Sequence, residues 1–234
     1  MKRSCATVTA WKWSALWGVA DLAEIPTKET LLRATAEKEG AETLERFQAA
    51  SVAVCGLGGL GSNIAITLAR AGVGRLILLD FDRVEITNLQ RQQYKASQIG
   101  RYKAEALAEN LREIAPYTIL ESHAVRLAPE NLRTFLGDAD VICEAFDNAE
   151  AKAMLTNGVL ETMPEKYYVA ASGVAGLGPA NTVRTRRIAE RFYLCGDTVS
   201  DVADGLGLFP SRVMLSAAHE AHAILRILAG EYDV

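Results

Sequence analysis

Cysteine is scarce in this chain, and the spacing of the residue excludes its commonest structural uses. The four cysteines are far apart and form no Cys-x-x-Cys pair: Cys5, Cys55, Cys143 and Cys195. A zinc ribbon needs closely spaced pairs, and a disulfide framework needs a denser set in a short chain. The pattern is typical of the reducing cytoplasm, which is where we expect this protein.

Long hydrophobic runs are also missing. Only 1–20 resembles a targeting segment, because Lys2 and Arg3 precede apolar residues, but Lys12 interrupts the run. No other segment approaches the roughly 20 apolar residues that a membrane-spanning helix needs. We therefore expect an N-terminal arm rather than a signal peptide, and no membrane association.

The chain also lacks an excess of positive charge. Lys and Arg number 25 against 29 Asp and Glu, so the formal net charge is -4. Nucleic-acid binding depends on neutralising phosphates, and this balance provides no global field that favours it. Nucleic acid is therefore not the expected partner. Half of the 234 residues are hydrophobic, which is enough for a substantial core.

Strand and helix patterns alternate along most of the chain. Strands are predicted at 52–54, 75–80, 119–124, 140–145 and 167–171, and helices at 62–71, 102–114, 132–136 and 149–161. This alternation predicts an α/β, Rossmann-like fold with a mostly parallel sheet and flanking helices. A polar strand at 181–187 indicates an antiparallel C-terminal portion of the sheet.

The two ends of the chain carry helix signals. Thr27 is a candidate N-cap, a second helix is predicted at 41–49, and a long final helix opens at Ser211 and ends at Gly230. We therefore divide the chain into an N-terminal extension, 1–47, and one nucleotide-binding domain, 48–234.

A glycine-rich turn follows the first core strand. The residues 54–61 read Val-Cys-Gly-Leu-Gly-Gly-Leu-Gly, and a helix is predicted directly after them. In such a turn Gly56 permits the tight bend, Gly58 lets backbone N–H groups approach a phosphate, and Gly61 allows the helix to pack on the strand. The N-terminus of the following helix attracts anions. The motif alone is compatible with ATP or with a dinucleotide.

Charged residues downstream favour ATP over a dinucleotide. Asp80 lies at the end of the second strand, where an acidic residue hydrogen-bonds a ribose in either ligand. A triphosphate also needs cations where pyrophosphate leaves, and Arg91 and Lys103 can supply them. Taken singly, each of these cations would more often be a solvated surface charge.

Asp147 follows the strand at 140–145, at the sheet edge where open α/β folds bind ligands. One carboxylate is sufficient for Mg²⁺, which keeps phosphate oxygens and water as its other ligands. The competing interpretation is a helix cap, because Asn148 and Glu150 begin the next helix.

These motifs together resemble the ThiF/MoeB family of ubiquitin-activating-enzyme-like adenylyltransferases, over roughly 44–230. The matching blocks are 56–62, Ala71-Gly72-Val73-Gly74, Asp80-Phe81-Asp82, Asn88-Leu89-Gln90-Arg91-Gln92, Gly100 with Lys103, and Ala145-Phe146-Asp147-Asn148. The sequence is most similar to the short ThiF subgroup, through Ala170-Ala171-Ser172-Gly173 and through 184–186 leading into 192–197.

The resemblance implies ATP-dependent adenylylation of the C-terminal glycine carboxylate of a ThiS-like, ubiquitin-like sulfur carrier protein that ends in Gly-Gly. Pyrophosphate would leave, and a sulfur donor would act on the acyl-adenylate in thiamine-thiazole biosynthesis. The resemblance places Arg91 and Lys103 on the departing phosphates, and Asp147 on magnesium. The remaining residues that it implies contact ATP are Gly56, Gly58, Gly59, Gly61, Asp80, Asp82, Asn88 and Gln92.

The resemblance also implies a homodimer. Dimeric members contribute an N-terminal arginine to the neighbouring subunit's ATP, a role for which Arg33 or Arg46 is available here. The paired zinc cysteines of larger members are missing, so no zinc is expected. Some members use a thiol after adenylylation, and Cys195, beside Gly196 and a glycine-rich segment, is the candidate for sulfur transfer, although a core position is the simpler interpretation.

Two other functions share part of this sequence pattern. A tRNA threonylcarbamoyladenosine dehydratase-like enzyme of the same superfamily would use the same ATP residues but needs a tRNA-binding surface. The acidic charge balance argues against such a surface. The arginines at 184, 186, 187 and 191 could instead dock an acidic surface of the carrier, or they could simply be solvated. A non-catalytic or NAD-binding Rossmann module is the third alternative, and Arg91, Lys103 and Asp147 argue against it. His219 and His222 have the wrong spacing for a zinc-protease helix.

Overall fold

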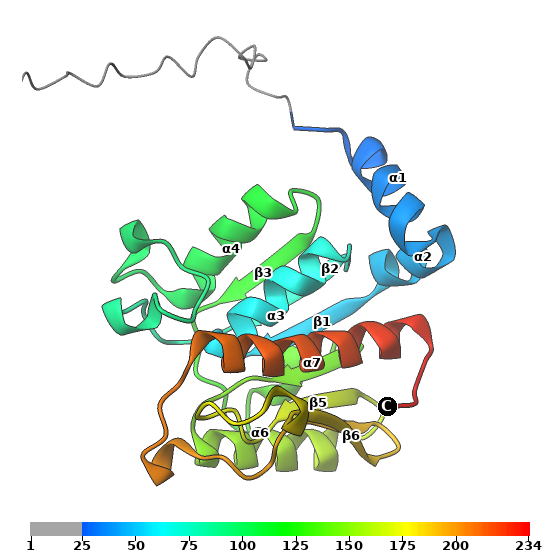
Figure 1. Ribbon diagram of the computed structural model, residues 1–234. Coiled ribbons are helices and arrows are strands. Elements are labelled where there is room, and N and C mark those ends of the chain that lie inside the picture. The colour runs from blue at the N-terminus through cyan, green and yellow to red at the C-terminus, as the bar shows by residue number, and fades with distance from the viewer. Residues whose placement is uncertain (1–24) are drawn as a thin grey trace, which may run out of the picture.

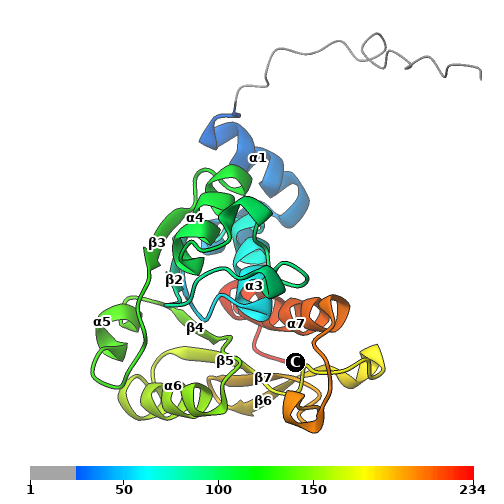
Figure 2. The same cartoon turned by 90° about the vertical axis from the view of Figure 1, so that its left-hand side faces the viewer.

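A computed structural model describes residues 25–234, so the predicted arm at 1–20 and Cys5 lie outside the described residues. One sheet runs through the molecule in the strand order β3-β2-β1-β4-β5-β7-β6 (Figures 1 and 2). The strands are β1 (Ser51–Cys55), β2 (Arg75–Leu79), β3 (Ile119–His123), β4 (Val141–Glu144), β5 (Tyr167–Ala171), β6 (Arg184–Ala189) and β7 (Phe192–Gly196). All neighbouring strands are parallel except β6 and β7, which confirms the predicted fold class.

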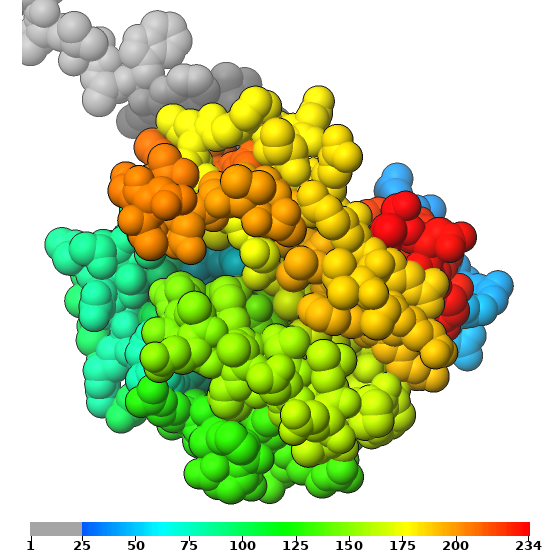
Figure 3. Space-filling model, turned by 90° about the horizontal axis from the view of Figure 1, so that it is seen from below, coloured from blue at the N-terminus to red at the C-terminus, as the bar shows by residue number. Residues whose placement is uncertain are grey.

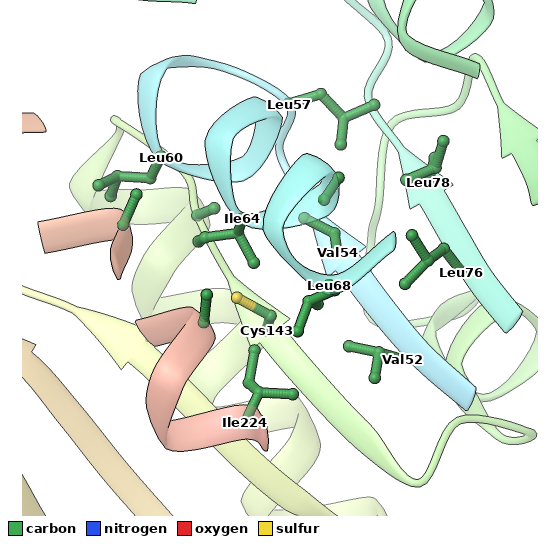
Figure 4. Close-up of a cluster of buried hydrophobic side chains, with 14 of the residues drawn as sticks. Val52, Val54, Leu57, Leu60, Ile64, Leu68, Leu76, Leu78, Cys143 and Ile224 are labelled. Atoms are coloured by element: carbon green, nitrogen blue, oxygen red, sulfur yellow. The ribbon is translucent and has the colours of Figure 1, made fainter. Parts of the chain in front are cut away.

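Helices cover both faces of the sheet (Figure 2). The longer ones are α3 (Gly59–Arg70), α4 (Lys103–Ile114), α6 (Ala149–Thr162) and α7 (Pro210–Ala229), and α5 (Leu132–Leu136) is a short one. Alternate residues of β1 point to opposite faces. Val52 and Val54 pack with α3 and α7 (Figure 4), whereas Ala53 and Cys55 join the apolar cluster that includes α5 and α6. The result is three layers, with the sheet in the middle.

The C-terminal part of the sheet differs in detail from the sequence prediction. The expected strand at 181–187 is shifted, because a 3-10 turn, Ala180–Thr182, precedes β6. The strand β7 was not predicted, and it lies between β5 and β6. Residues of β7 are buried because the strand pairs with β5 on one side and with β6 on the other. The sequence of a single segment does not indicate which distant segments it will pair with.

Two helices precede the sheet. Thr27 caps α1 (Lys28–Glu39) by accepting a hydrogen bond from the Thr30 N–H at 3.3 Å, as predicted. Helix α1 buries none of its residues, whereas α2 (Ala41–Ala49) buries Leu44 and Phe47. The boundary predicted at residue 48 therefore falls inside a helix that packs on the domain. No helix in 25–234 is long and apolar enough to cross a membrane.

Candidate functional site

A cleft of about 670 Å³ lies at the carboxyl ends of β2, β1, β4 and β5. It gathers most of the residues that the sequence motifs selected, although these are far apart in the chain. The hollow is visible in Figure 3 between the teal segment after β2, the green segments around α6 and the orange segment after β7. This is the edge at which open α/β sheets bind their ligands.

The glycine turn forms one wall of the cleft. Gly56 has φ 91°, and a Cβ there would lie 2.9 Å from the Ala145 carbonyl oxygen. At Gly61 a Cβ would lie 1.8 Å from the Gly56 oxygen, so the helix approaches the turn as predicted. Gly58 is the N-cap of α3 and has no side-chain cap. The first N–H groups of the helix therefore have no intrahelical partner and border the cleft, which suits an anion.

Asp80 and Asp82 form the neighbouring wall with Lys103. The Asp80 carboxylate is nearly buried and accepts hydrogen bonds from the N–H groups of Leu57 at 2.7 Å and Asp82 at 2.8 Å. Burial raises its pKa, while the Lys103 cation and these backbone donors oppose the rise. The Lys103 ammonium lies 3.0 Å from Asp82 Oδ2. This contact leaves Lys103 with further N–H groups for a ligand.

Arg91 and Gln92 lie opposite the glycine turn. A Cβ on Gly59 would lie 3.5 Å from Arg91 Cδ, which places the arginine stem directly against the turn. The Gln92 side chain is buried, and its Oε1 atom has no hydrogen-bond partner in 25–234. A buried amide without a partner is costly unless a ligand or water completes it. Both residues border the cleft.

Asn88 has a different place from its neighbours in the same motif. Its Oδ1 accepts a hydrogen bond from the Glu85 N–H at 2.9 Å and shapes the 3-10 turn Ile86–Asn88. The residue is buried but does not line the cleft. In this conformation Asn88 holds the segment that leads to Arg91.

The structure separates the two interpretations of Asp147. Asn148, not Asp147, caps α6, accepting a hydrogen bond from the Ala151 N–H at 3.0 Å. The Asp147 side chain is exposed, lines the cleft, and has no hydrogen bond or ion pair within the described part of the chain. An available carboxylate beside a phosphate-binding turn fits a Mg²⁺ ligand. No group of three or more His, Cys, Asp or Glu residues that could hold a metal occurs in 25–234.

Lys152 is a cation at the cleft that the sequence motifs did not indicate. Its ammonium lies 2.9 Å from Glu144 Oε2 and 3.0 Å from the Ala171 carbonyl oxygen. Glu144 is fully enclosed at the end of β4, and burial raises its pKa against the effect of Lys152. A carboxylate in an apolar strand needs a partner of opposite charge. The position of Glu144 at the end of an apolar strand was therefore the sequence signal that could have indicated such a cation.

Cys195 lies inside β7 rather than in a loop. Its side chain is 0% exposed, and its Sγ donates to Thr185 Oγ1 at 3.6 Å. Burial raises the thiol pKa. The exposure that its position suggested is therefore absent, although a role in sulfur transfer stays a prediction. Cys55 and Cys143 are also buried.

The two arginines considered for a neighbouring subunit's site lie on the first two helices. Arg46, on α2, donates to the Ala229 oxygen at 2.7 Å and pairs with Glu42 at 2.9 Å. Arg33, on α1, is exposed and has no partner in 25–234. Of the two, Arg33 is the one left available in this conformation.

The family model described as "ThiF family" matches residues 31–213, which include the glycine turn, Asp80, Arg91, Lys103 and Asp147. The chain belongs to the ThiF family. Curated relatives share its sequence over parts of their length. A sulfur carrier protein adenylyltransferase of Thermus thermophilus is 36% identical over 122 residues, which are 52% of this chain and 45% of the relative. The adenylyltransferase and sulfurtransferase MOCS3 of Xenopus laevis is 30% identical over 195 residues, 79% of this chain and 42% of that protein.

Another relative is the ubiquitin-like modifier-activating enzyme 5 of Oryza sativa, 32% identical over 133 residues that make up 51% of this chain and 32% of the relative. This ThiF family chain thus spans less than half the length of the relatives that it matches.

Solved structures share the fold of this ThiF family chain. The E. coli tRNA N6-threonylcarbamoyladenosine dehydratase TcdA, in complex with ATP, superposes with a TM-score of 0.79 at 21% identity. That likeness covers 88% of this chain and 97% of the other. E. coli MccB with ATP gives a TM-score of 0.66 at 19% identity, over 83% of this chain and 59% of the other.

Proposed function

We propose that this protein is an ATP-dependent adenylyltransferase that acts on the C-terminal glycine carboxylate of a ThiS-like, ubiquitin-like sulfur carrier protein in thiamine-thiazole biosynthesis. One observation carries the proposal: a single cleft brings together the glycine turn, the cations of Arg91 and Lys103, and the carboxylate of Asp147. The Thermus relative, whose name states this type of activity, supports it.

The residues suit a reaction that needs charge stabilisation rather than a protein nucleophile. The carrier's carboxylate is ionised at neutral pH and attacks the α-phosphorus of ATP. A bond forms between the carboxylate oxygen and phosphorus as the bond to the bridging oxygen breaks, and pyrophosphate leaves with the electron pair. Arg91 and Lys103 would stabilise the leaving group, and the turn would orient the phosphates.

Other residues would hold the nucleotide. Asp80 presents a carboxylate at the ribose side, since it follows β2, the strand next to the glycine turn. The Gln92 amide and Asp82 border the same space. Asp147 would hold Mg²⁺, which would neutralise phosphate charge when bound. We also propose that the enzyme works as a homodimer, with Arg33 available for the neighbouring site.

The test is isotope exchange between ATP and pyrophosphate, with purified protein, magnesium and candidate carriers that end in Gly-Gly, including ThiS. A carrier shortened by its last glycine is the matched control for the acceptor. Arg91→Ala should lower exchange by about 10²-fold or more. Arg83→Ala is the matched control, because Arg83 lies outside the cleft and donates to the Gly100 oxygen at 2.7 Å. Measurable ATP binding without exchange for any carrier would reject a carrier as the acceptor.

A dehydratase acting on tRNA threonylcarbamoyladenosine is the second candidate. It is favoured by the likeness in fold to TcdA, which spans nearly all of that chain, and by Arg184, which is exposed on the edge strand β6. Retention of tRNA in an electrophoretic assay at physiological salt, with ATP turnover stimulated by that tRNA, would select this candidate. Tight NAD binding without ATP turnover would instead indicate a Rossmann module with no such activity.

A further inference from the structure

Two loops meet backbone to backbone at one rim of the cleft. The first, 172–179, follows β5, and the second, 197–207, follows β7. The Thr198 N–H donates to the Ser172 oxygen at 3.0 Å, and the Asp197 N–H donates to the Gly173 oxygen at 3.1 Å. A Cβ on Gly173, which has φ 78°, would lie 2.0 Å from Asp197 Oδ1. The loops therefore form one connected wall.

Arg212 binds both loops from beneath. Its guanidinium is buried and lies in the first turn of α7. One terminal nitrogen donates to the oxygens of Gly178 at 3.2 Å and Pro179 at 2.8 Å, in the first loop. The other donates to Thr182 Oγ1 at 3.0 Å and to Asp197 Oδ2 at 2.6 Å. Both terminal nitrogens are thus fully used, and none of their donors remains for a ligand.

Asp197 transmits this contact to the surface of the cleft. Its second oxygen accepts hydrogen bonds from the N–H groups of Val199 and Ser200, both at 2.9 Å, and from the Ser200 hydroxyl at 3.0 Å. Burial opposes ionisation of Asp197, but these hydrogen bonds and the one from Arg212 lower its pKa. Thr198, between them, has the positive φ of 63°. The segment 198–202 that this carboxylate shapes lines the cleft.

The strand order places this wall on the side of the cleft away from the ribose position. Asp80 follows β2, the glycine turn follows β1, Asp147 follows β4, and the two loops follow β5 and β7. A nucleotide with its ribose at Asp80 and its phosphates at the turn leaves the β5 and β7 side for the group that attacks the α-phosphate.

We propose that the buried Arg212–Asp197 pair positions the wall that receives the acceptor carboxylate, and so determines the binding of the acceptor rather than that of ATP. This rests on the proposed adenylyltransferase function. Both residues are positioning residues: each acts through the loop segment 198–202, and neither lines the cleft. The one donor of the pair without a partner in 25–234, Arg212 Nε, is buried. Arg212 also precedes Val213, which lines the cleft and packs at Gly59, so the same helix turn contacts both halves of the site.

The test compares Arg212→Met and Asp197→Asn with Ile224→Val. The control removes a methyl group from the buried face of the same helix without touching either loop. Hydrogen exchange of peptides covering 197–207 is measured by mass spectrometry, and Kd for Mg-ATP and KM for the carrier are measured alongside it. Asp197→Asn keeps the side-chain volume and an acceptor for the loop N–H groups, so it remains informative if Arg212→Met folds poorly.

We expect both variants, but not the control, to exchange faster in 197–207 while β1 and α3 remain protected. The KM for the carrier should rise about tenfold or more, and Kd for ATP should stay within about twofold. Arg212→Lys, which keeps the charge but not the planar fork, should restore part of the carrier KM. If hydrogen exchange in 197–207 is the same in the variants as in the wild type, the inference is wrong although the proposed function stands. The same holds if the KM for the carrier in the two variants equals that of the Ile224→Val control. If wild-type protein forms no adenylate with any carrier, the proposed function fails and the inference fails with it.

Discussion

The ammonium of Lys152 lies 2.9 Å from the buried carboxylate of Glu144, and this pair joins two segments that border the cleft. Glu144 Oε1 also accepts a hydrogen bond from the Phe146 N–H at 2.7 Å, directly before Asp147. Lys152 donates to the Ala171 oxygen at the end of β5. The connection that carries Asp147 is therefore held by a carboxylate that depends on a single cation.

Removing that cation should destabilise the protein in a pH-dependent way. Lys152→Met leaves Glu144 buried without its partner, which should cost about 3 kcal/mol of unfolding free energy. Burial already raises the pKa of Glu144, and loss of Lys152 raises it further. A carboxyl group with a higher pKa in the folded than in the unfolded protein stabilises the fold at pH values below its unfolded pKa. That stabilisation is lost as pH rises through the folded pKa. The deficit measured by urea unfolding should therefore be larger at pH 8 than at pH 5.

Lys95→Met is the matched control for this measurement, because Lys95 forms an exposed pair with Glu113 at 2.8 Å. Such surface pairs contribute about 0–1 kcal/mol. Equal losses of stability in the two variants, or a deficit that does not grow with pH, would show that Glu144 does not depend on Lys152.

Asp147→Asn should remove magnesium-dependent catalysis without affecting the fold. The side chain is exposed and makes no hydrogen bond in 25–234, so its replacement breaks no internal contact. We expect adenylate formation to fall by about 10²-fold or more, since a charged group that stabilises the transition state is lost. Exchange between ATP and pyrophosphate at several magnesium concentrations measures this. Glu150→Gln, a neighbouring cleft carboxylate, is the control; wild-type exchange by the Asp147 variant would reject its role as a metal ligand.

Glu220 should make the protein less stable as pH rises. The residue is fully buried on α7, its Oε1 has no partner in the described residues, and Cys143 Sγ donates to Oε2 at 3.7 Å. Burial raises its pKa well above the ordinary value. The folded protein therefore holds a proton that the unfolded chain releases above about pH 4.5, and stability should fall from there upward by at most about 1.4 kcal/mol per pH unit.

Glu220→Gln should remove this dependence, so the variant should gain stability relative to the wild type between pH 5 and pH 8. Unfolding free energies at both values measure the effect. Glu161→Gln, an exposed change on α6, should leave the slope unaltered. Parallel pH profiles for the wild type and Glu220→Gln would mean that Glu220 is already ionised in the folded state.

Cys195→Ser should spare adenylate formation. The thiol is buried, and burial raises its pKa, so it is unreactive in this conformation. A serine hydroxyl can still bond Thr185, and we expect a loss of about 1 kcal/mol of stability. Alkylation followed by peptide mass spectrometry should modify Cys195 only after unfolding. Rapid labelling of native protein at Cys195 would show that β7 opens and would favour a covalent role in sulfur transfer.

Sequence reasoning recovered the units of this fold that have local signals. Five of the six parallel strands, β1 to β5, and the helices between them are indicated by apolar periodicity, glycine turns and caps such as Thr27. The strand β7 was missed, because its burial comes from pairing with β5 and β6 rather than from its own residues. The beginning of α3 was placed three residues late, at Ser62 instead of Gly59, since glycines rarely begin a predicted helix.

The residues of the candidate site likewise divide into those that the sequence indicated and those whose place only the structure shows. The glycine turn, Asp80 and Asp147 were selected from sequence because each follows a strand, and strand ends meet at one edge of a parallel sheet. Arg91 and Lys103 were selected as cations for a triphosphate. The cleft indeed contains all of them. Asn88, in the same motif as Arg91, holds a 3-10 turn in this conformation, and its contact with ATP stays a prediction.

What the sequence determined by itself is the order of β1 to β5 and of the helices between them, and the chemistry gathered at one sheet edge, because both depend on local periodicity and on motif spacing. Only the tertiary structure decided that Asn148 rather than Asp147 caps α6, that Cys195 is enclosed, and that Glu144 and Asp197 are paired with Lys152 and Arg212. Those outcomes depend on which side chains meet after folding. Burial and partnership are properties of the packed chain, and no single segment carries them.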